Sequence, residues 1–147
     1  MTRRLALVAL LAALVGCEPM GPIPGRRLSG EVVATPVDDW AFAGGEETLQ
    51  LEARPDDPYS VNVWFVAQGS RLWVASAGGD VTGWGEMMIA DPRVRLRIDG
   101  KLYERKAARV TEQAETDEVV VLYKTKYDYQ RDPQDDGQAV LFRMDPR

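Results

Sequence analysis

The chain of 147 residues contains no histidine and a single cysteine, Cys17. Without histidine the protein lacks the usual general base and the commonest metal ligand, so Ser-His-Asp catalysis is excluded. One cysteine cannot form an internal disulfide, and the fold must therefore be held by its apolar core. Acidic residues outnumber basic ones by 23 to 18. This balance repels phosphate backbones and argues against nucleic acid as a partner.

The first sixteen residues have the three parts of a secretory signal. Arg3 and Arg4 precede an apolar run, residues 5–15, that is too short to span a bilayer as a permanent helix. The junction Leu14-Val15-Gly16-Cys17 resembles the bacterial lipobox, in which cleavage precedes a cysteine that carries a diacylglyceryl group on its sulfur. The resemblance implies a palmitate-type lipid anchor on Cys17. It places the protein in the cell envelope, with its domain facing the periplasm or the cell exterior.

Several alternatives stay open at this end of the chain. Cys17 can instead be the free thiol of an ordinary secreted protein. Arg3 and Arg4 can belong to a twin-arginine signal, although the rest of that motif is missing. Glu18, which follows the cysteine, leaves the choice between inner and outer membrane open. If Cys17 is acylated, thiol catalysis and zinc binding through cysteine are excluded as well.

Proline and glycine are concentrated directly after the cysteine. Residues 17–27 are predicted to be the lipidated N-terminus and a tether that lifts the domain off the headgroups, because the segment contains Pro19, Gly21, Pro22, Pro24 and Gly25. Residues 28–147 are then long enough for one domain with one core.

The rest of the chain reads mainly as short strands separated by turns. Predicted strands cover residues 28–35, 47–54, 61–66, 71–76, 93–98, a partner that starts at 101, and 139–144. Residues 61–66 are nearly all apolar, which predicts a central strand buried on both faces. Asp99-Gly100 predicts a two-residue hairpin in which Leu96 faces Tyr103 and Arg95 faces Glu104.

Two segments are predicted to be helical. Residues 82–90 stop before Pro92, since the residue before a proline avoids helical geometry. Residues 116–127 start at a possible N-cap, Thr116, and end with basic residues that suit the helix dipole. The β-branched run at 119–121 opposes this second helix.

The most specific motif lies between Trp84 and Val94. It reads Trp-Gly-Glu-Met-Met-Ile-Ala-Asp-Pro-Arg-Val and follows the pair Gly78-Gly79. It resembles the split β-barrel of the pyridoxamine-phosphate-oxidase-like flavoproteins, and more closely the deazaflavin-dependent nitroreductases, over residues 60–111. The resemblance implies a mainly β (α+β) domain, an antiparallel split β-barrel of six to seven strands with two helices. It also implies a possible homodimer.

The same resemblance implies a cleft for FMN or a deazaflavin beside the barrel. Carried over by position, the phosphate side of this cleft is lined by Ser76, Gly78, Gly79 and Trp84, and its ring side by Asn62 and Trp64. Two departures weaken the cofactor inference. Asp80 stands near the place where a cation usually neutralises the phosphate, and Met87 replaces the asparagine of the helix.

Other candidate sites have plain structural explanations. Arg93, Arg95 and Arg97 form a stripe that can receive a phosphate or an acidic headgroup, but alternation alone predicts them on a solvent-facing strand. The acids in the polar loop 131–138 can bind calcium or be solvated. Tryptophans on strands are more often core than ligand wall, and Trp84 is the favoured exception. No catalytic residue and no metal ligand are assigned.

Three functions are compatible with this reading. The first is an envelope lipoprotein whose barrel binds a small ligand or flavin-like cofactor with little or no catalysis. The second is a structural or interaction lipoprotein that uses the barrel as a scaffold. The third is a flavin- or deazaflavin-dependent reductase, in which the cofactor carries the chemistry and histidine is not needed.

Overall fold

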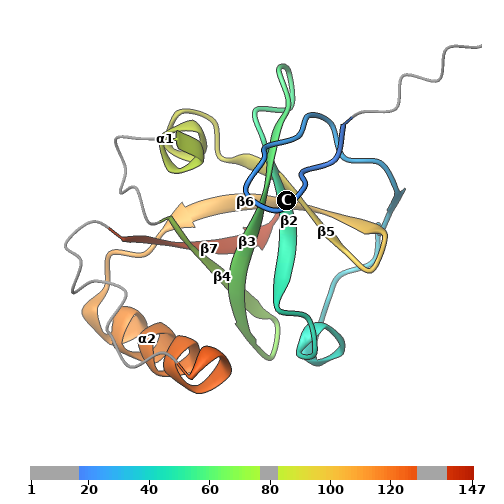
Figure 1. Ribbon diagram of the computed structural model, residues 1–147. Helices are drawn as coiled ribbons and strands as arrows, with labels where there is room; N and C mark the ends of the chain where they lie inside the picture. The colour runs from blue at the N-terminus through green and yellow to red at the C-terminus, as the bar shows by residue number, and fades with distance from the viewer. Residues whose placement is uncertain (1–16, 77–82, 129–138) are drawn as a thin grey trace, which may run out of the picture.

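The computed structural model describes residues 17–76, 83–128 and 139–147 of the chain. Its sheet has the strand order β1-β6-β5-β2-β3-β4-β7, and pairing of β6 with β7 closes six strands into a barrel (Figure 1). The strands are β1 (Glu31–Val32), β2 (Thr48–Ala53), β3 (Tyr59–Gln68), β4 (Arg71–Ser76), β5 (Arg93–Ile98), β6 (Lys101–Arg109) and β7 (Val140–Pro146). The barrel pairs are antiparallel, and β1 adds to β6 in parallel. The predicted antiparallel barrel of six to seven strands is confirmed.

The β5–β6 hairpin has the predicted register. Leu96 pairs with Tyr103, and Arg95 pairs with Glu104. Asp99 and Gly100 both adopt positive φ angles, 48° and 73°, as a tight hairpin turn between twisted strands requires. Local turn chemistry and strand alternation are sufficient to fix this part of the fold.

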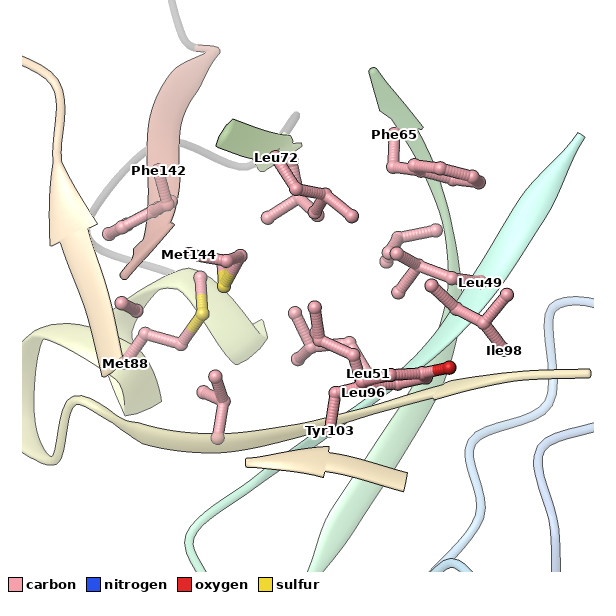
Figure 2. Close-up of a cluster of buried hydrophobic side chains, with 14 of the residues drawn as sticks. Leu49, Leu51, Phe65, Leu72, Met88, Leu96, Ile98, Tyr103, Phe142 and Met144 are labelled. Carbon is pink, nitrogen blue, oxygen red and sulfur yellow. The ribbon is translucent and has the colours of Figure 1, made fainter. Parts of the chain in front are cut away.

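Inward side chains from the six closed strands fill the barrel. Figure 2 shows this core, to which β2 contributes Leu49 and Leu51, β3 contributes Phe65, and the other elements contribute Leu72, Met88, Leu96, Ile98, Tyr103, Phe142 and Met144. A second, smaller cluster lies outside the barrel and buries Val66, Trp73 and Leu141 against helix α2. The strands β3, β4 and β7 are therefore covered on both faces where α2 crosses them.

Three helical segments connect the strands. They are the short 3-10 helix η1 (Ala41–Ala43), α1 (Gly83–Ala90) and α2 (Gln113–Tyr127). The two predicted helices are confirmed. None of the helices in the described ranges is long and apolar enough to cross a membrane.

Three details of the prediction are wrong. The strand expected at 28–35 shrinks to two residues, Glu31–Val32, and at Leu28 the backbone N–H donates to the Glu52 side chain instead of to a neighbouring strand. Helix α2 starts three residues before Thr116, which is buried inside it. Strand β3 is not buried on both faces along its whole length, since Trp64 is 45 % exposed although it stacks on the last residue of α2.

The N-terminal segment, residues 17–30, lies along the outer face of β2, β3 and β5. Gly25 exchanges two backbone hydrogen bonds with Ser60, of 2.8 and 3.0 Å. A side chain on Gly25 would collide with the backbone of Cys17 and Pro19, so glycine is required there. The predicted tether is irregular in structure, but it packs against the barrel from Cys17 onward and does not extend away from it.

A buried ion pair fastens this segment. Glu52 is 1 % exposed, accepts the backbone N–H of Leu28 at 2.6 Å, and pairs with Arg95 at 2.8 Å. Arg95 also donates to the carbonyl of Leu28. Three charged or polar groups from distant parts of the chain thus satisfy one another beneath the N-terminal segment, which agrees with the rule that buried charges are paired.

We predict that Glu52→Ala lowers the free energy of unfolding by about 3 kcal/mol or more, because it leaves Arg95 without its partner and the Leu28 N–H without an acceptor. Urea unfolding followed by tryptophan fluorescence measures the loss. The control is Asp56→Ala, which removes the exposed partner of Arg93 and is expected to have little effect. Equal losses in the two variants would contradict the assigned role of the buried pair.

Candidate functional site

The structure separates the residues predicted to line a cofactor cleft. Asn62 and Trp64 lie two residues apart on the outer face of β3. Ser76 is buried at the end of β4, and Trp84, at the start of α1, packs partly buried against the barrel core. Gly78 and Gly79 lie outside the described residues, as does the candidate calcium loop at 131–138. Among the described site residues, Asn62 and Trp64 thus lie outside the barrel, Ser76 is buried, and Trp84 packs against the core.

Trp64 is the exposed member of a stack of aromatic rings. Its ring lies 4.4 Å from that of Tyr127 with an angle of 9° between the planes, and Tyr127 in turn stacks on Tyr123. Tyr127 covers one face of the Trp64 ring, and Trp64 as a whole is 45 % exposed. Trp64 and the two tyrosines are called the aromatic platform below.

Backbone contacts hold Tyr127 in place. Its hydroxyl accepts the N–H of Phe65 at 2.9 Å and lies 2.8 Å from the carbonyl oxygens of both Phe65 and Glu47, one of which it can donate to at a time. Burial raises the pKa of Tyr127 to about 12, so the hydroxyl keeps its proton at neutral pH. Tyr123 donates its hydroxyl hydrogen to the carbonyl of Trp64. The aromatic platform is therefore held in place by the hydrogen bonds of both tyrosines that support Trp64, Tyr127 and Tyr123.

Lys126 lies close to this platform. Its ammonium donates to the carbonyl of Phe65 at 3.0 Å and sits 3.5 Å from the centre of the Phe65 ring. Burial lowers the pKa of Lys126 to about 8, while the nearby charge of Glu46 opposes the change. The amine can therefore gain or lose a proton at mildly alkaline pH.

On the ring side of the predicted cleft, Trp64 is the residue suited to contact a planar ring. Its exposed part can take part in stacking on an isoalloxazine-like ring. The side-chain amide of Asn62, however, already donates to the carbonyl of Gly21 in the N-terminal segment. The predicted phosphate loop falls outside the described residues, so the ring side alone can be compared with the cofactor.

A cavity of about 600 Å³ opens on the other side of α2, between its first turns and strands β4 and β7. Two arginines and four carboxylates contribute to its wall, which is lined by Val37, Ser70, Arg71, Glu112, Ala114, Glu115, Glu118, Arg143, Met144, Asp145 and Pro146. The residues predicted from the sequence are not among them. Sequence reasoning missed this cavity because its charged groups come from three elements far apart in the chain.

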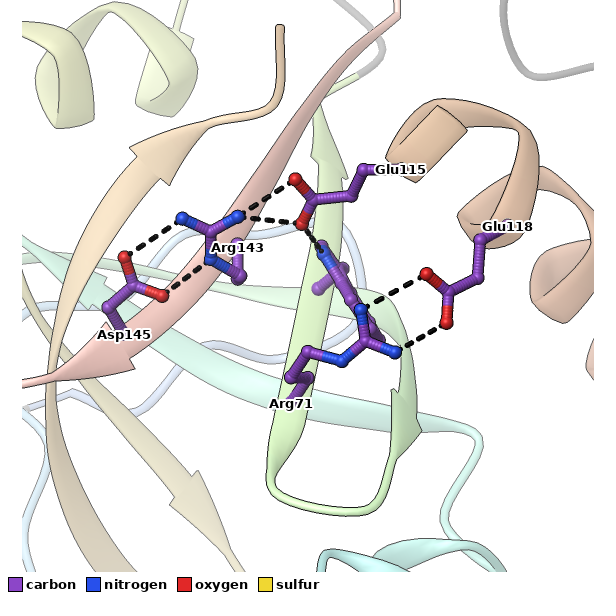
Figure 3. Close-up of polar contacts among 6 residues, drawn as sticks. Arg71, Glu115, Glu118, Arg143 and Asp145 are labelled. Carbon is purple, nitrogen blue, oxygen red and sulfur yellow. Dashed lines mark hydrogen bonds and ion pairs between the residues drawn. The ribbon is translucent and has the colours of Figure 1, made fainter. Parts of the chain in front are cut away.

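The charged side chains of the cavity satisfy one another (Figure 3). Arg143 donates hydrogen bonds to both Glu115 and Asp145. Arg71 forms a bidentate ion pair with Glu118. The ring nitrogen of Trp73 donates to Glu115 at 2.8 Å. Both arginines are thus neutralised, and carboxylates are in excess. The cavity suits a neutral or cationic group better than a phosphate.

Glu115 is the centre of this network. Burial by itself would raise the pKa of Glu115, but hydrogen bonds from Trp73 and Arg143 outweigh it and hold the pKa below its ordinary value of 4.5. The hydrogen bonds that Arg143 donates to Asp145 and Glu115 raise the pKa of Arg143. The ionised form of Glu115 therefore stabilises the packing of α2 on the barrel. No group of three or more possible metal ligands was found in the described parts of the chain.

We predict that Glu115→Gln destabilises the protein at pH 7 by about 1.5 kcal/mol, since the charge-assisted bonds to Arg143 are lost. A folded-state pKa below the unfolded value gives stabilisation that is fully present above the unfolded pKa and is lost as the pH falls through the folded pKa. The difference in unfolding free energy between wild type and variant should thus be constant from pH 7 to pH 5 and shrink below pH 4.5.

Thermal or urea unfolding at a series of pH values measures this difference. Glu112→Gln, at the rim of the same cavity, is the matched control and should leave the pH dependence unchanged. A gap between wild type and Glu115→Gln that stays constant down to pH 3 would argue against the network.

The barrel places the chain among proteins of the split β-barrel class. It is similar to a conserved hypothetical protein from Mycobacterium tuberculosis, with a TM-score of 0.62 and 19 % identity over 82 % of this chain and 86 % of that one. It is also similar to a candidate pyridoxamine 5′-phosphate oxidase from Listeria innocua, with a TM-score of 0.57 and 16 % identity over 73 % and 89 % of the two chains. An F420-H2 dependent reductase gives a TM-score of 0.57 and 16 % identity over 68 % and 95 %. At these identities the likeness concerns the fold.

Residues 43–137 match the family described as "Uncharacterized protein conserved in bacteria (DUF2255)". Because the match spans more than half of the chain, the protein belongs to this family. No curated protein matches the chain closely enough to count as a relative.

Proposed function

We propose that the protein is a lipid-anchored binding protein of the cell envelope whose barrel holds a small planar ligand against Trp64, with little or no chemistry of its own. The observation that carries the proposal is the exposed but immobilised Trp64–Tyr127 stack. A tryptophan at a strand position is usually core, whereas Trp64 is 45 % exposed, and an exposed aromatic surface gains stability when a ligand covers it.

The support behind Trp64 favours binding over a chance exposure. Tyr127 is fixed by contacts with the Phe65 and Glu47 backbone, and Tyr123 by its bond to the Trp64 carbonyl. A rigid platform loses little conformational entropy when a ligand stacks on it, which is the physical advantage of preorganisation. The fold likeness to the reductase supports a flavin- or deazaflavin-like ring as the first ligand class to test.

Low catalytic capacity follows from the groups around the stack. Lys126 is the titratable amine beside it, and its contacts with Phe65 direct it toward the strand. The chain contains no histidine to act as a base. Any redox chemistry would therefore have to come from the bound ring itself.

The anchor is supported by the surface next to Cys17. Cys17 is exposed, and its carbonyl accepts the N–H of Arg26 at 2.7 Å. A short turn follows it, closed by two backbone bonds between Met20 and Ile23, whose side chains are 71 % and 60 % exposed. Apolar side chains beside an acylated cysteine would enter the outer part of a lipid layer together with the acyl chains.

We predict that FMN quenches the tryptophan fluorescence of the purified full-length chain in detergent, with saturation. Trp64→Ala should weaken binding by about tenfold or more, because stacking on an aromatic ring contributes about 1–3 kcal/mol. Trp84→Phe is the matched control and should bind like wild type. Riboflavin, which lacks the phosphate, should bind nearly as well as FMN if the ring carries the affinity.

A flat titration with FMN and with a deazaflavin would reject the ligand and leave the scaffold function. Quenching that is lost in Trp84→Phe but kept in Trp64→Ala would move the site to α1. Strong binding of FMN with none of riboflavin would show that a phosphate site dominates.

A separate prediction concerns the anchor. Cys17→Ser should abolish labelling with radioactive palmitate, because the sulfur is the acceptor of the diacylglyceryl group. Met20→Ser, three residues away, is the control and should keep the label. An unlabelled wild-type protein would refute the anchor without affecting the ligand proposal.

A further inference from the structure

Arg105 is a cation on the inner side of the barrel. It lies on β6 between Tyr103 and Ala107, both of which belong to the core, and it pairs across the sheet with Val94 and Pro146. It is 7 % exposed. Strand alternation therefore directs the side chain of Arg105 inward, with its Nε sealed from solvent and its terminal nitrogens at the end of the barrel.

Among the residues that the structure describes, Arg105 has no acidic partner. Within residues 17–76, 83–128 and 139–147 no carboxylate lies within ion-pair distance of its guanidinium, and its Nε is sealed from solvent without a hydrogen bond. The contrast with Arg95 is direct, since that half-buried arginine pairs with Glu52. A buried charge is normally paired, because desolvation makes an uncompensated ion costly.

Aromatic rings compensate part of this charge. The guanidinium lies 5.1 Å from the centre of the Trp40 ring, close enough for a cation–π interaction. Trp40 is itself in edge contact with Tyr103, and Phe42 packs beside both rings. Burial lowers the pKa of Arg105, which indicates that these contacts do not fully replace its lost hydration.

A second hydrogen-bond donor lies beside the guanidinium. Tyr103 is two residues away on the same face of β6, and Figure 2 shows it among the core side chains. Burial raises the pKa of Tyr103, with a further contribution from Asp99, so its hydroxyl keeps its proton. In the described parts of the chain no protein group accepts a hydrogen bond from this hydroxyl. Phe42, which is 56 % exposed, provides an apolar wall at the rim.

We propose that Arg105 and Tyr103 form a binding site for a small oxyanion, a carboxylate or a phosphate, at the barrel end covered by Trp40 and η1. The anion supplies the charge that the core lacks and accepts hydrogen bonds from the guanidinium and the hydroxyl. This site is on the inside of the barrel, whereas the Trp64 platform is on its outside, so the two proposals stand or fall separately.

The test is thermal unfolding of the full-length chain at constant ionic strength, with chloride replaced stepwise by phosphate in one series and by benzoate in another. Wild type should gain several degrees in midpoint temperature in at least one series. Arg105→Met should show no gain. The control is Lys106→Met, which removes the same charge from the exposed side of the same strand and should respond like wild type.

A second variant covers the case in which Arg105→Met does not fold. Tyr103→Phe keeps the ring and removes the hydroxyl, and it should raise the dissociation constant of the anion about threefold to tenfold, measured through the fluorescence of the adjacent Trp40. A response to phosphate alone identifies a phosphate site, and a response to benzoate alone identifies a site for apolar carboxylates. No response of wild type to either anion, or an equal response in Arg105→Met, would overturn the proposal.

Discussion

The pairing of β7 with both β4 and β6 is the constraint on which the other features depend. It turns a sheet into a closed barrel, and closure divides every strand residue into one that faces a common core and one that faces outward. Arg105 is buried because β6 is part of this closed wall. Trp73 and Leu141 face outward on neighbouring strands for the same reason, and they give α2 the apolar surface on which it packs.

The position of α2 follows from that surface and determines both outer sites. Its later turns carry Tyr123 and Tyr127 to Trp64, and its first turns carry Glu115 and Glu118 to the arginines of β4 and β7. One helix thus has an aromatic end and an ionic end. The ionic end is satisfied within the protein, whereas Trp64 at the aromatic end is 45 % exposed. This difference is why the ligand is assigned to Trp64.

Local signals predicted the local parts of the fold. The Asp99-Gly100 turn and the alternation of residues 93–98 were enough for the β5–β6 register, and Pro92 was enough to end α1. Trp64 could be selected by resemblance, but its exposure depends on where α2 ends, which no neighbouring residue specifies. The role of Tyr127 and the isolation of Arg105 depend in the same way on long-range packing. The N-terminal segment looked like a free tether because proline and glycine also suit a chain that lies flat against a sheet.

The arginines show how composition can mislead about charge. Three arginines on β5 look like an anion-binding stripe, yet each is paired with an acid. Arg93 pairs with Asp91, Arg95 with Glu52 and Arg97 with Glu18. Arg105 looks like one more alternating cation, yet it is buried and has no acidic partner among the described residues. Counting charges along a strand therefore gives the wrong order of importance, because burial and partners decide what a charge can do.

The closing strand also sets an order in time. β7 is the last of the described strands along the chain and pairs with both β4 and β6. The sheet therefore keeps two unpaired edges, on β4 and β6, until residue 146 has been synthesised. Its core can therefore form only after nearly all of the described chain is present, a late step dominated by contacts distant in sequence. Such a chain stays without a folded core for most of its synthesis. An unfolded chain suits the passage through a membrane that the proposed anchor requires.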